Sequence, residues 1–99
     1  MRIGLVCAAL LAAVPMGAAA KDPAARNLAA PCAICHGTGG QSATGVVNSL
    51  AGMPQGDFAA RMNGFRNGTR PATVMHQIAK GYTDPQIAQL AAWFAAQKR

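Results

Sequence analysis

Large aliphatic and aromatic side chains are scarce over most of this 99-residue chain. Residues 21–99 contain only 12 Leu, Ile, Val and Phe residues, about 15% of 79, whereas alanine alone accounts for 16. An ordinary globular core becomes doubtful when these four residue types fall below roughly 20% of a chain. Domains of this size also tend to need a staple in addition to their apolar core. The sequence therefore predicts one small domain whose centre is filled by something besides side chains.

The first twenty residues are typical of a secretory signal peptide. Met1-Arg2 forms the charged start, residues 3–14 form the apolar run, and residues 18–20, all alanine, form a cleavage site of small residues. The apolar run is too short to span a bilayer. We therefore expect export to the periplasm, cleavage after about Ala20, and a mature domain of residues 21–99.

The charge balance is basic. The whole chain carries +6, and residues 21–99 carry +5 because eight basic residues face three acidic ones. The basic residues are spread from Lys21 to Arg99, with no run longer than two. This spread favours a solvated surface over a nucleic-acid site, and it is compatible with a mild attraction to an acidic protein.

No segment alternates as a strand would, so the sequence predicts an all-α domain. Asp22 and Pro23 are typical of a helix start, and the alanine-rich helix that follows should end or kink at Pro31. Residues 37–47, rich in Gly, Ser, Thr and Asn, predict a loop.

Three further helices are predicted. One covers residues 57–67, with Asp57 as its cap and Gly68 as its stop, and a short one covers residues 71–80. The last begins after Thr83, which forms a capping box with Gln86. The apolar faces are Phe58, Met62 and Phe65 on the first of these helices and Ile87, Leu90, Ala91 and Phe94 on the last, where Lys98 and Arg99 suit the C-terminal end of the helix dipole.

The motif that carries chemistry is Cys32-Ala33-Ile34-Cys35-His36, a C-x-x-C-H sequence. This spacing is the attachment signature of c-type haem. Two thiols three residues apart can add to the two vinyl groups of one porphyrin, and the adjacent histidine can supply an axial nitrogen to the iron. Attachment takes place outside the cytoplasm, which agrees with the signal peptide. We therefore predict one covalently bound haem c.

Three other uses of these residues stay open at this point. Two neighbouring cysteines in an exported protein can form a disulfide. A redox dithiol normally lies in a βαβ unit, which the sequence does not contain. A zinc site needs four ligands, and Cys32, Cys35, His36 and the distant His76 resemble no common zinc motif.

The sixth iron ligand has four candidates: Met53, Met62, Met75 and His76. A methionine is more often core filler than ligand, and Met62 fits the apolar face of its helix. Met53 lies in a connection close to the motif. Met75 follows His36 by 39 residues, which gives the chain room to wrap around the haem, and its neighbour His76 would face elsewhere on a helix. Spacing favours Met75.

The sequence resembles the class I cytochromes c over nearly all of residues 21–99. The stretch 50–54 (Leu-Ala-Gly-Met-Pro), the stretch 65–70 and above all residues 70–84 are similar to small bacterial cytochromes that include the haem subunit of flavocytochrome c sulfide dehydrogenase. The resemblance implies three to four helices around one haem, thioether bonds from Cys32 and Cys35, and axial ligation by His36 and Met75.

Two departures from these relatives stand out. Asn48 occupies the position where they commonly have a proline whose carbonyl accepts a hydrogen bond from the haem histidine; the carbonyl itself is still available. Pro31 interrupts the helix that usually runs into the motif. The single C-x-x-C-H implies a monohaem form.

The resemblance implies an electron-transfer subunit with no chemistry of its own. Its partner would be a flavoprotein (FAD) sulfide dehydrogenase subunit, in a heterodimer, and the iron would cycle between Fe(III) and Fe(II) before passing electrons to a downstream acceptor. One alternative is a freely diffusing monohaem carrier that serves an oxidase or another reductase. Another is a gas or redox sensor, which needs an exchangeable sixth ligand.

Overall fold

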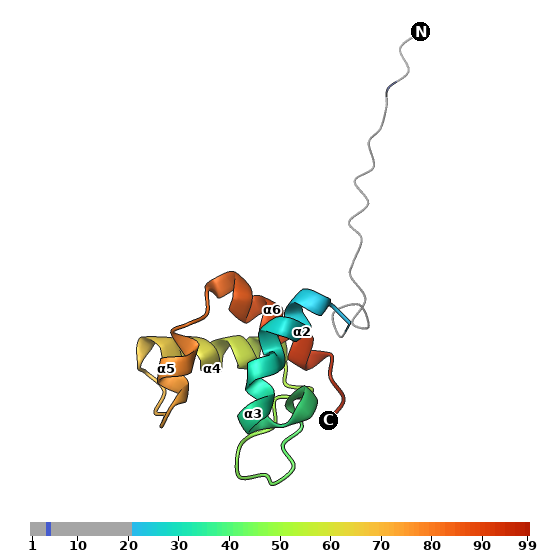
Figure 1. Ribbon diagram of the computed structural model, residues 1–99. Coiled ribbons are helices and arrows are strands. Elements are labelled where there is room, and N and C mark those ends of the chain that lie inside the picture. Colours follow the sequence, from blue (N-terminus) through green and yellow to red (C-terminus); the bar gives the residue numbers. More distant parts are fainter. Residues whose placement is uncertain (1–3, 5–20) are drawn as a thin grey trace.

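A computed structural model describes residue 4 and residues 21–99. The predicted signal peptide, Gly4 apart, lies outside the described residues. All regular elements in residues 21–99 are helical, which confirms the predicted all-α class (Figure 1). None of these helices is both long and apolar enough to cross a bilayer. The elements are α2 (Pro23–Ala29), η1 (Ala30–Cys32), α3 (Ala33–His36), η2 (Thr38–Gly40), α4 (Gln55–Asn67), α5 (Met75–Ala79) and α6 (Asp84–Ala95), where η denotes a 3₁₀ turn.

The N-terminal helix starts and stops where the sequence predicts. The Asp22 carboxylate accepts a hydrogen bond from the Ala24 amide at 3.1 Å, and Pro23 occupies the first helical position. The α-helix ends at Ala29, and the chain continues through η1, because Pro31 cannot donate the next backbone hydrogen bond. The C-x-x-C-H motif therefore spans a change of helical geometry, because Cys32 ends η1 and residues 33–36 form the short helix α3.

The two middle helices differ from the prediction at their starts. Helix α4 begins at Gln55, with Pro54 before it, so Asp57 lies in its first turn and is not its cap. The fixed φ of proline suits the entrance of a helix, and Asp57 still lies near the positive end of the dipole. Gly68 ends α4 in the left-handed conformation, as predicted.

Helix α5 covers only Met75–Ala79, so the predicted start at Pro71 is wrong. The β-branched residues Thr73 and Val74 lose rotamer freedom in a helix, and Val74 has a non-helical φ of −131°. Residues 71–74 therefore cross the molecule as irregular chain before α5 begins.

The predicted capping box of α6 is confirmed. The Thr83 hydroxyl accepts from the Gln86 amide at 3.3 Å, and the Gln86 side chain accepts from the Thr83 amide at 3.0 Å. The helix ends at Ala95, so Lys98 and Arg99 lie beyond its last turn. The Lys98 carbonyl instead accepts from the Gln41 side chain at 2.6 Å, and the Arg99 guanidinium donates to the Gly52 carbonyl at 3.2 Å. The C-terminal residues thus hold the loop between α3 and α4.

The core is small and centres on α6. Helices α2 and α4 both pack against α6, and α5 packs against α4. The Phe94 ring stacks on Phe58 at a centroid distance of 5.5 Å and meets Trp93 edge-on at 5.0 Å. The predicted apolar face of α6 is fully buried. The core residues are Ala25, Ala29, Phe58, Met62, Ala79, Ile87, Leu90, Ala91, Trp93 and Phe94.

Gly40 brings the loop against this core. Its carbonyl accepts from the Leu50 amide at 2.7 Å and the Ala51 amide at 3.1 Å, which joins the two ends of the loop. A β-carbon at Gly40 would lie 2.9 Å from the Ala51 nitrogen and 2.9 Å from the Phe94 ring. Only glycine allows this close approach, and its φ of 79° is also one that side chains disfavour.

We expect Gly40→Ala to destabilise the domain more than Gly45→Ala. Both glycines have a positive φ, but nothing lies within 4 Å of a β-carbon at Gly45. Each variant meets the left-handed penalty of about 1–2 kcal/mol, and Gly40→Ala adds overpacking of about 1–3 kcal/mol. Urea unfolding of the purified proteins measures the difference. Equal losses would show that the contact with Phe94 relaxes without cost.

Candidate functional site

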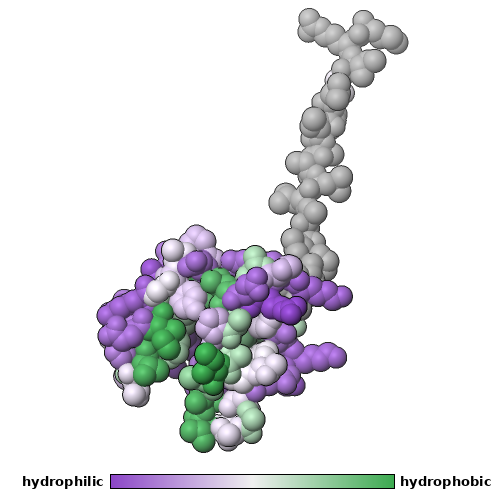
Figure 2. Space-filling model, in the orientation of Figure 1, coloured by the Kyte–Doolittle hydropathy of each residue, from purple (hydrophilic) through white to green (hydrophobic). Residues whose placement is uncertain are grey.

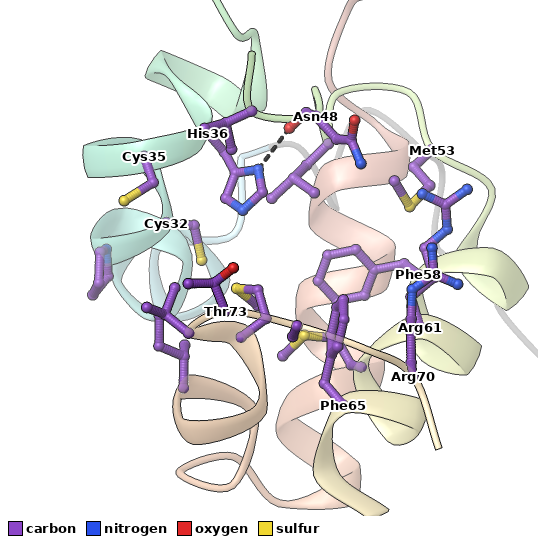
Figure 3. Close-up of a pocket in the computed structure, with 18 of the residues that line it drawn as sticks. Cys32, Cys35, His36, Asn48, Met53, Phe58, Arg61, Phe65, Arg70 and Thr73 are labelled. Atoms are coloured by element: carbon purple, nitrogen blue, oxygen red, sulfur yellow. Dashed lines mark hydrogen bonds between the residues drawn. The ribbon is translucent and has the colours of Figure 1, made fainter. Parts of the chain in front are cut away.

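A cavity of about 650 Å³ opens between four segments of the chain (Figure 3). One wall is the turn into α3 together with α3 itself, residues 31–36. The other walls of the cavity are formed by the loop residues 46–53, helix α4 and the segment 71–82. Its volume lies within the ~300–1,000 Å³ that is usual for cofactor and small-molecule sites. The lining residues that the sequence singled out are Cys32, Cys35, His36, Met53, Phe58, Met62, Phe65 and Met75.

Cys32 reaches the cavity from the end of η1, and Cys35 and His36 reach it from α3. Cys32 is half-buried and Cys35 is exposed, and both carry free thiols. The His36 ring is held by its Nδ1, which lies 2.6 Å from the Asn48 carbonyl oxygen. A carbonyl can only accept, so Nδ1 carries the proton and donates. In the neutral ring the other nitrogen, Nε2, then has a lone pair available for a metal.

The Asn48 carbonyl accepts from His36 although the usual proline is absent, which answers a question that the sequence left open. Neighbouring hydrogen bonds stabilise this stretch of loop in place of the proline ring. The Ser49 hydroxyl accepts from the Ser42 amide at 2.9 Å, and the Leu50 amide donates to the Gly40 carbonyl at 2.7 Å. The loop is therefore clamped on the C-terminal side of Asn48, and the orientation of the carbonyl follows from that clamp.

The alternatives that the sequence left open find little support in the described residues. Burial raises the pKa of the Cys32 thiol above its ordinary value, whereas a reactive dithiol needs a lowered one. Within residues 21–99, no three His, Cys, Asp or Glu side chains come together to hold a metal ion. Cys32 and Cys35 are not joined in a disulfide. The two free thiols thus lie at the rim of an apolar cavity.

All three candidate methionines line the cavity, and they differ in burial and position. Met62 is only 6% exposed and belongs to the core, as predicted. Met53 and Met75 are half-buried at the edge of that core. Figure 3 shows Met53 on one side of the pocket and Thr73 on the side where Cys32 lies. Met75 lines the cavity from the segment 71–82, which also carries Thr73. His76 does not line it.

Exposed apolar side chains gather around the cavity. Among the residues described, the large hydrophobic side chains that are exposed are Ile34 (86%), Val46 (87%), Val74 (54%) and Ile78 (44%), and all four line it. Figure 2 shows the corresponding apolar surface over α3, over the loop below it and beside α5. A cluster of exposed apolar side chains in a folded protein usually marks a surface that binds a ligand or a partner. A flat apolar macrocycle tethered at the thiols fits this lining.

Two arginines are functional candidates that the sequence reasoning missed. Arg61 of α4 and Arg70, which follows that helix, line the cavity, and none of the lining residues is acidic. The spacing of Arg61 gave a signal, because it precedes Phe65 by four residues and so shares its helix face. The position of Arg70 depends on the irregular chain after Gly68, which the sequence alone did not predict.

Comparison with known proteins gives a consistent set of relatives. No protein-family model matches the chain. The chain is 36% identical to the cytochrome subunit of sulfide dehydrogenase of Chlorobaculum tepidum, over 91% of the chain and 92% of that protein. It is 31% identical to cytochrome c-554(548) of Halomonas halodenitrificans, over 68% and 84%. It is also 34% identical to the thiosulfate dehydrogenase electron acceptor of Thiomonas intermedia, over 95% of the chain but only 44% of that longer protein.

Replacing both cysteines tests whether a bound cofactor completes the core. We expect the Cys32→Ala, Cys35→Ala double variant, exported from the same host, to retain no haem. It should also show no cooperative thermal unfolding, because the cavity walls then have no bound cofactor to pack against. Haem-linked peroxidase staining of denaturing gels and circular dichroism measure the two effects. Ile34→Ala, between the two cysteines, is the matched control and should keep both properties. A cooperatively folded double variant without haem contradicts the expectation.

Proposed function

Since the chain belongs to the class I cytochromes c, we propose that it passes single electrons from a sulfide-oxidising flavoprotein to a downstream acceptor in the periplasm. Electron transfer through covalently bound haem c is the activity of its family. The flavoprotein, the compartment and the role of each residue are the proposal. The observation that carries it is the arrangement of the C-x-x-C-H residues on the rim of a cavity, with the His36 ring oriented by Asn48.

Cys32 and Cys35 would hold the haem by thioether bonds at the α3 wall. His36 would ligate the iron through Nε2, the nitrogen that its bond to Asn48 leaves free. When bound, haem c supplies an iron that alternates between ferric and ferrous states. The apolar lining from α4 and from residues 46–53 would contact the macrocycle and keep water from that part of its surface.

Met75 is the proposed second axial ligand. It lines the cavity from the segment 71–82, whereas Met62 belongs to the buried core. Met53 lines the cavity too, and the resemblance to the class I cytochromes c favours Met75 over it. A methionine sulfur in this position raises the reduction potential and fills the last coordination position. Both effects suit a carrier that accepts electrons from a flavin, and they disfavour a gas sensor.

The proposed electron donor is a flavoprotein subunit that binds FAD and oxidises sulfide. The relative from Chlorobaculum tepidum is named as the cytochrome subunit of sulfide dehydrogenase and is similar to this chain over almost its full length. The periplasm is the expected compartment because haem c is attached outside the cytoplasm and because residues 1–20 are typical of a signal peptide. We propose a heterodimer in which this chain supplies no acid, base or nucleophile.

A freely diffusing carrier is the second candidate. The Thiomonas intermedia relative is named as an electron acceptor of thiosulfate dehydrogenase, so similar chains are associated with other sulfur-oxidising donors. The formal charge of +5 on residues 21–99 would favour brief encounters with acidic partners that weaken as salt rises.

Three methionine variants test which methionine ligates the haem iron and which ones only pack in the protein. We expect Met75→Ala to remove the weak sulfur-to-iron absorption band at the red end of the ferric spectrum and to lower the reduction potential. Met53→Ala should keep the band. Met62→Ala should also keep it while losing about 2–5 kcal/mol of unfolding free energy, because it leaves a hole in the core. Loss of the band in Met53→Ala together with its survival in Met75→Ala would reverse the assignment.

The donor is tested by co-purification from periplasm with flavin fluorescence as the readout. We expect a larger FAD protein to remain bound to the tagged cytochrome at high salt, and sulfide to reduce the cytochrome only in the fractions that contain it. Thiosulfate in place of sulfide is the matched control. A cytochrome that elutes alone at every salt concentration rejects the heterodimer and favours the diffusing carrier.

A further inference from the structure

Two positive charges face the side of the cavity away from the cysteines. Arg61, on α4, is half-buried, and Arg70, two residues beyond the end stop of that helix, is exposed. Figure 3 shows both side chains on the opposite side of the pocket from Cys32 and Cys35. They line the same cavity, so any group that fills it meets thiols at one edge and guanidinium groups at the other.

Arg70 is held in this position by its surroundings. Its amide donates to the Gly64 carbonyl at 3.0 Å, and its Cβ lies so close that a β-carbon on Gly64 would be 3.0 Å from it. Its guanidinium carbon lies 5.5 Å from the centre of the Phe65 ring, in a cation–π contact. Arg61, four residues before Phe65, lies on the same face of α4. The two arginines therefore flank one aromatic ring.

Neither arginine has an acidic partner in residues 21–99. The only ion pair there joins Arg66 to Asp84. The carboxylate of Asp22 caps α2, and Asp57 lies in the first turn of α4 and does not line the cavity. The two guanidinium groups therefore keep donors available for the carboxylates of a group bound in the cavity.

We propose that Arg61 and Arg70 bind the two propionate groups of the haem. The vinyl positions that receive the thiols and the positions that carry the propionates lie on opposite edges of the porphyrin. If Cys32 and Cys35 fix the first edge at α3, the propionate edge faces α4 and Arg70. Arginine is suited to this task because its planar fork pairs with carboxylates through two parallel hydrogen bonds. This inference rests on the haem attachment proposed above.

The pairing has a consequence for the electron carrier. Uncompensated propionates would stabilise the extra positive charge of ferric iron and lower the reduction potential. Arg61 and Arg70 offset that effect and keep the propionates ionised over the neutral range. The other titratable lining residues are Cys32, Cys35 and His36, which haem attachment occupies, and Tyr82, whose pKa burial raises further, with Cys32 adding to the shift.

The test compares Arg61→Gln and Arg70→Gln with Arg66→Gln, which removes the same charge from α4 outside the cavity. Reduction potentials and the NMR shifts of the haem methyl groups are measured between about pH 5 and pH 8 in the isolated cytochrome. We expect both cavity variants to have a lower potential and a new titration step, in which the potential falls as pH rises through the freed propionate. Arg66→Gln should match the parent protein.

Each outcome bears on one hypothesis. Circular dichroism reports whether each variant folds. If Arg70→Gln does not fold, Arg70→Lys replaces it. This variant keeps the charge but loses the planar fork, so its reduction potential should shift less. Unchanged potentials and shifts in folded variants overturn the propionate assignment. So does a change confined to salt-dependent binding of the flavoprotein, which would mean that the arginines bind carboxylates of a partner. A parent protein that holds no haem refutes the proposed function itself.

Discussion

The hydrogen bond from His36 to the Asn48 carbonyl is the interaction on which the site depends. It joins α3 to a loop that is otherwise distant, and it determines which ring nitrogen is free to face the cavity. The loop in turn depends on Gly40, whose carbonyl accepts two amides and whose α-carbon rests against Phe94 of the core helix α6. The orientation of the His36 ring therefore depends, through the loop, on how the C-terminal helix α6 packs.

Local signals in the sequence predicted some elements well. The capping box of Thr83 and Gln86 and the stop at Gly68 depend only on neighbouring residues, so they could be recognised without a structure. The C-x-x-C-H motif carries its chemistry in five consecutive residues. Asn48 was also found, because the resemblance pointed to its backbone carbonyl rather than to its side chain, and a carbonyl is present at every position.

Other elements could not be predicted because competing effects decide them. Pro54 starts α4 before Asp57 can cap it, and β-branched Thr73 and Val74 delay α5 until Met75. The place of Arg70 depends on its close approach to Gly64, a tertiary contact that no periodicity reveals. Sequence reasoning thus found the motif and the apolar residues that line the cavity, and it missed the two arginines, Arg61 and Arg70.

The thiols of Cys32 and Cys35 lie on the rim of an open cavity with a mostly apolar lining. A cofactor that is tethered there stays at a high effective concentration next to its pocket. The walls from α4 and residues 71–82 then need only weak non-covalent affinity for the cofactor. Occupancy of the cavity no longer depends on the concentration of free cofactor in solution. Such a domain can leave one edge of its cofactor uncovered towards a partner and still never lose it to solvent.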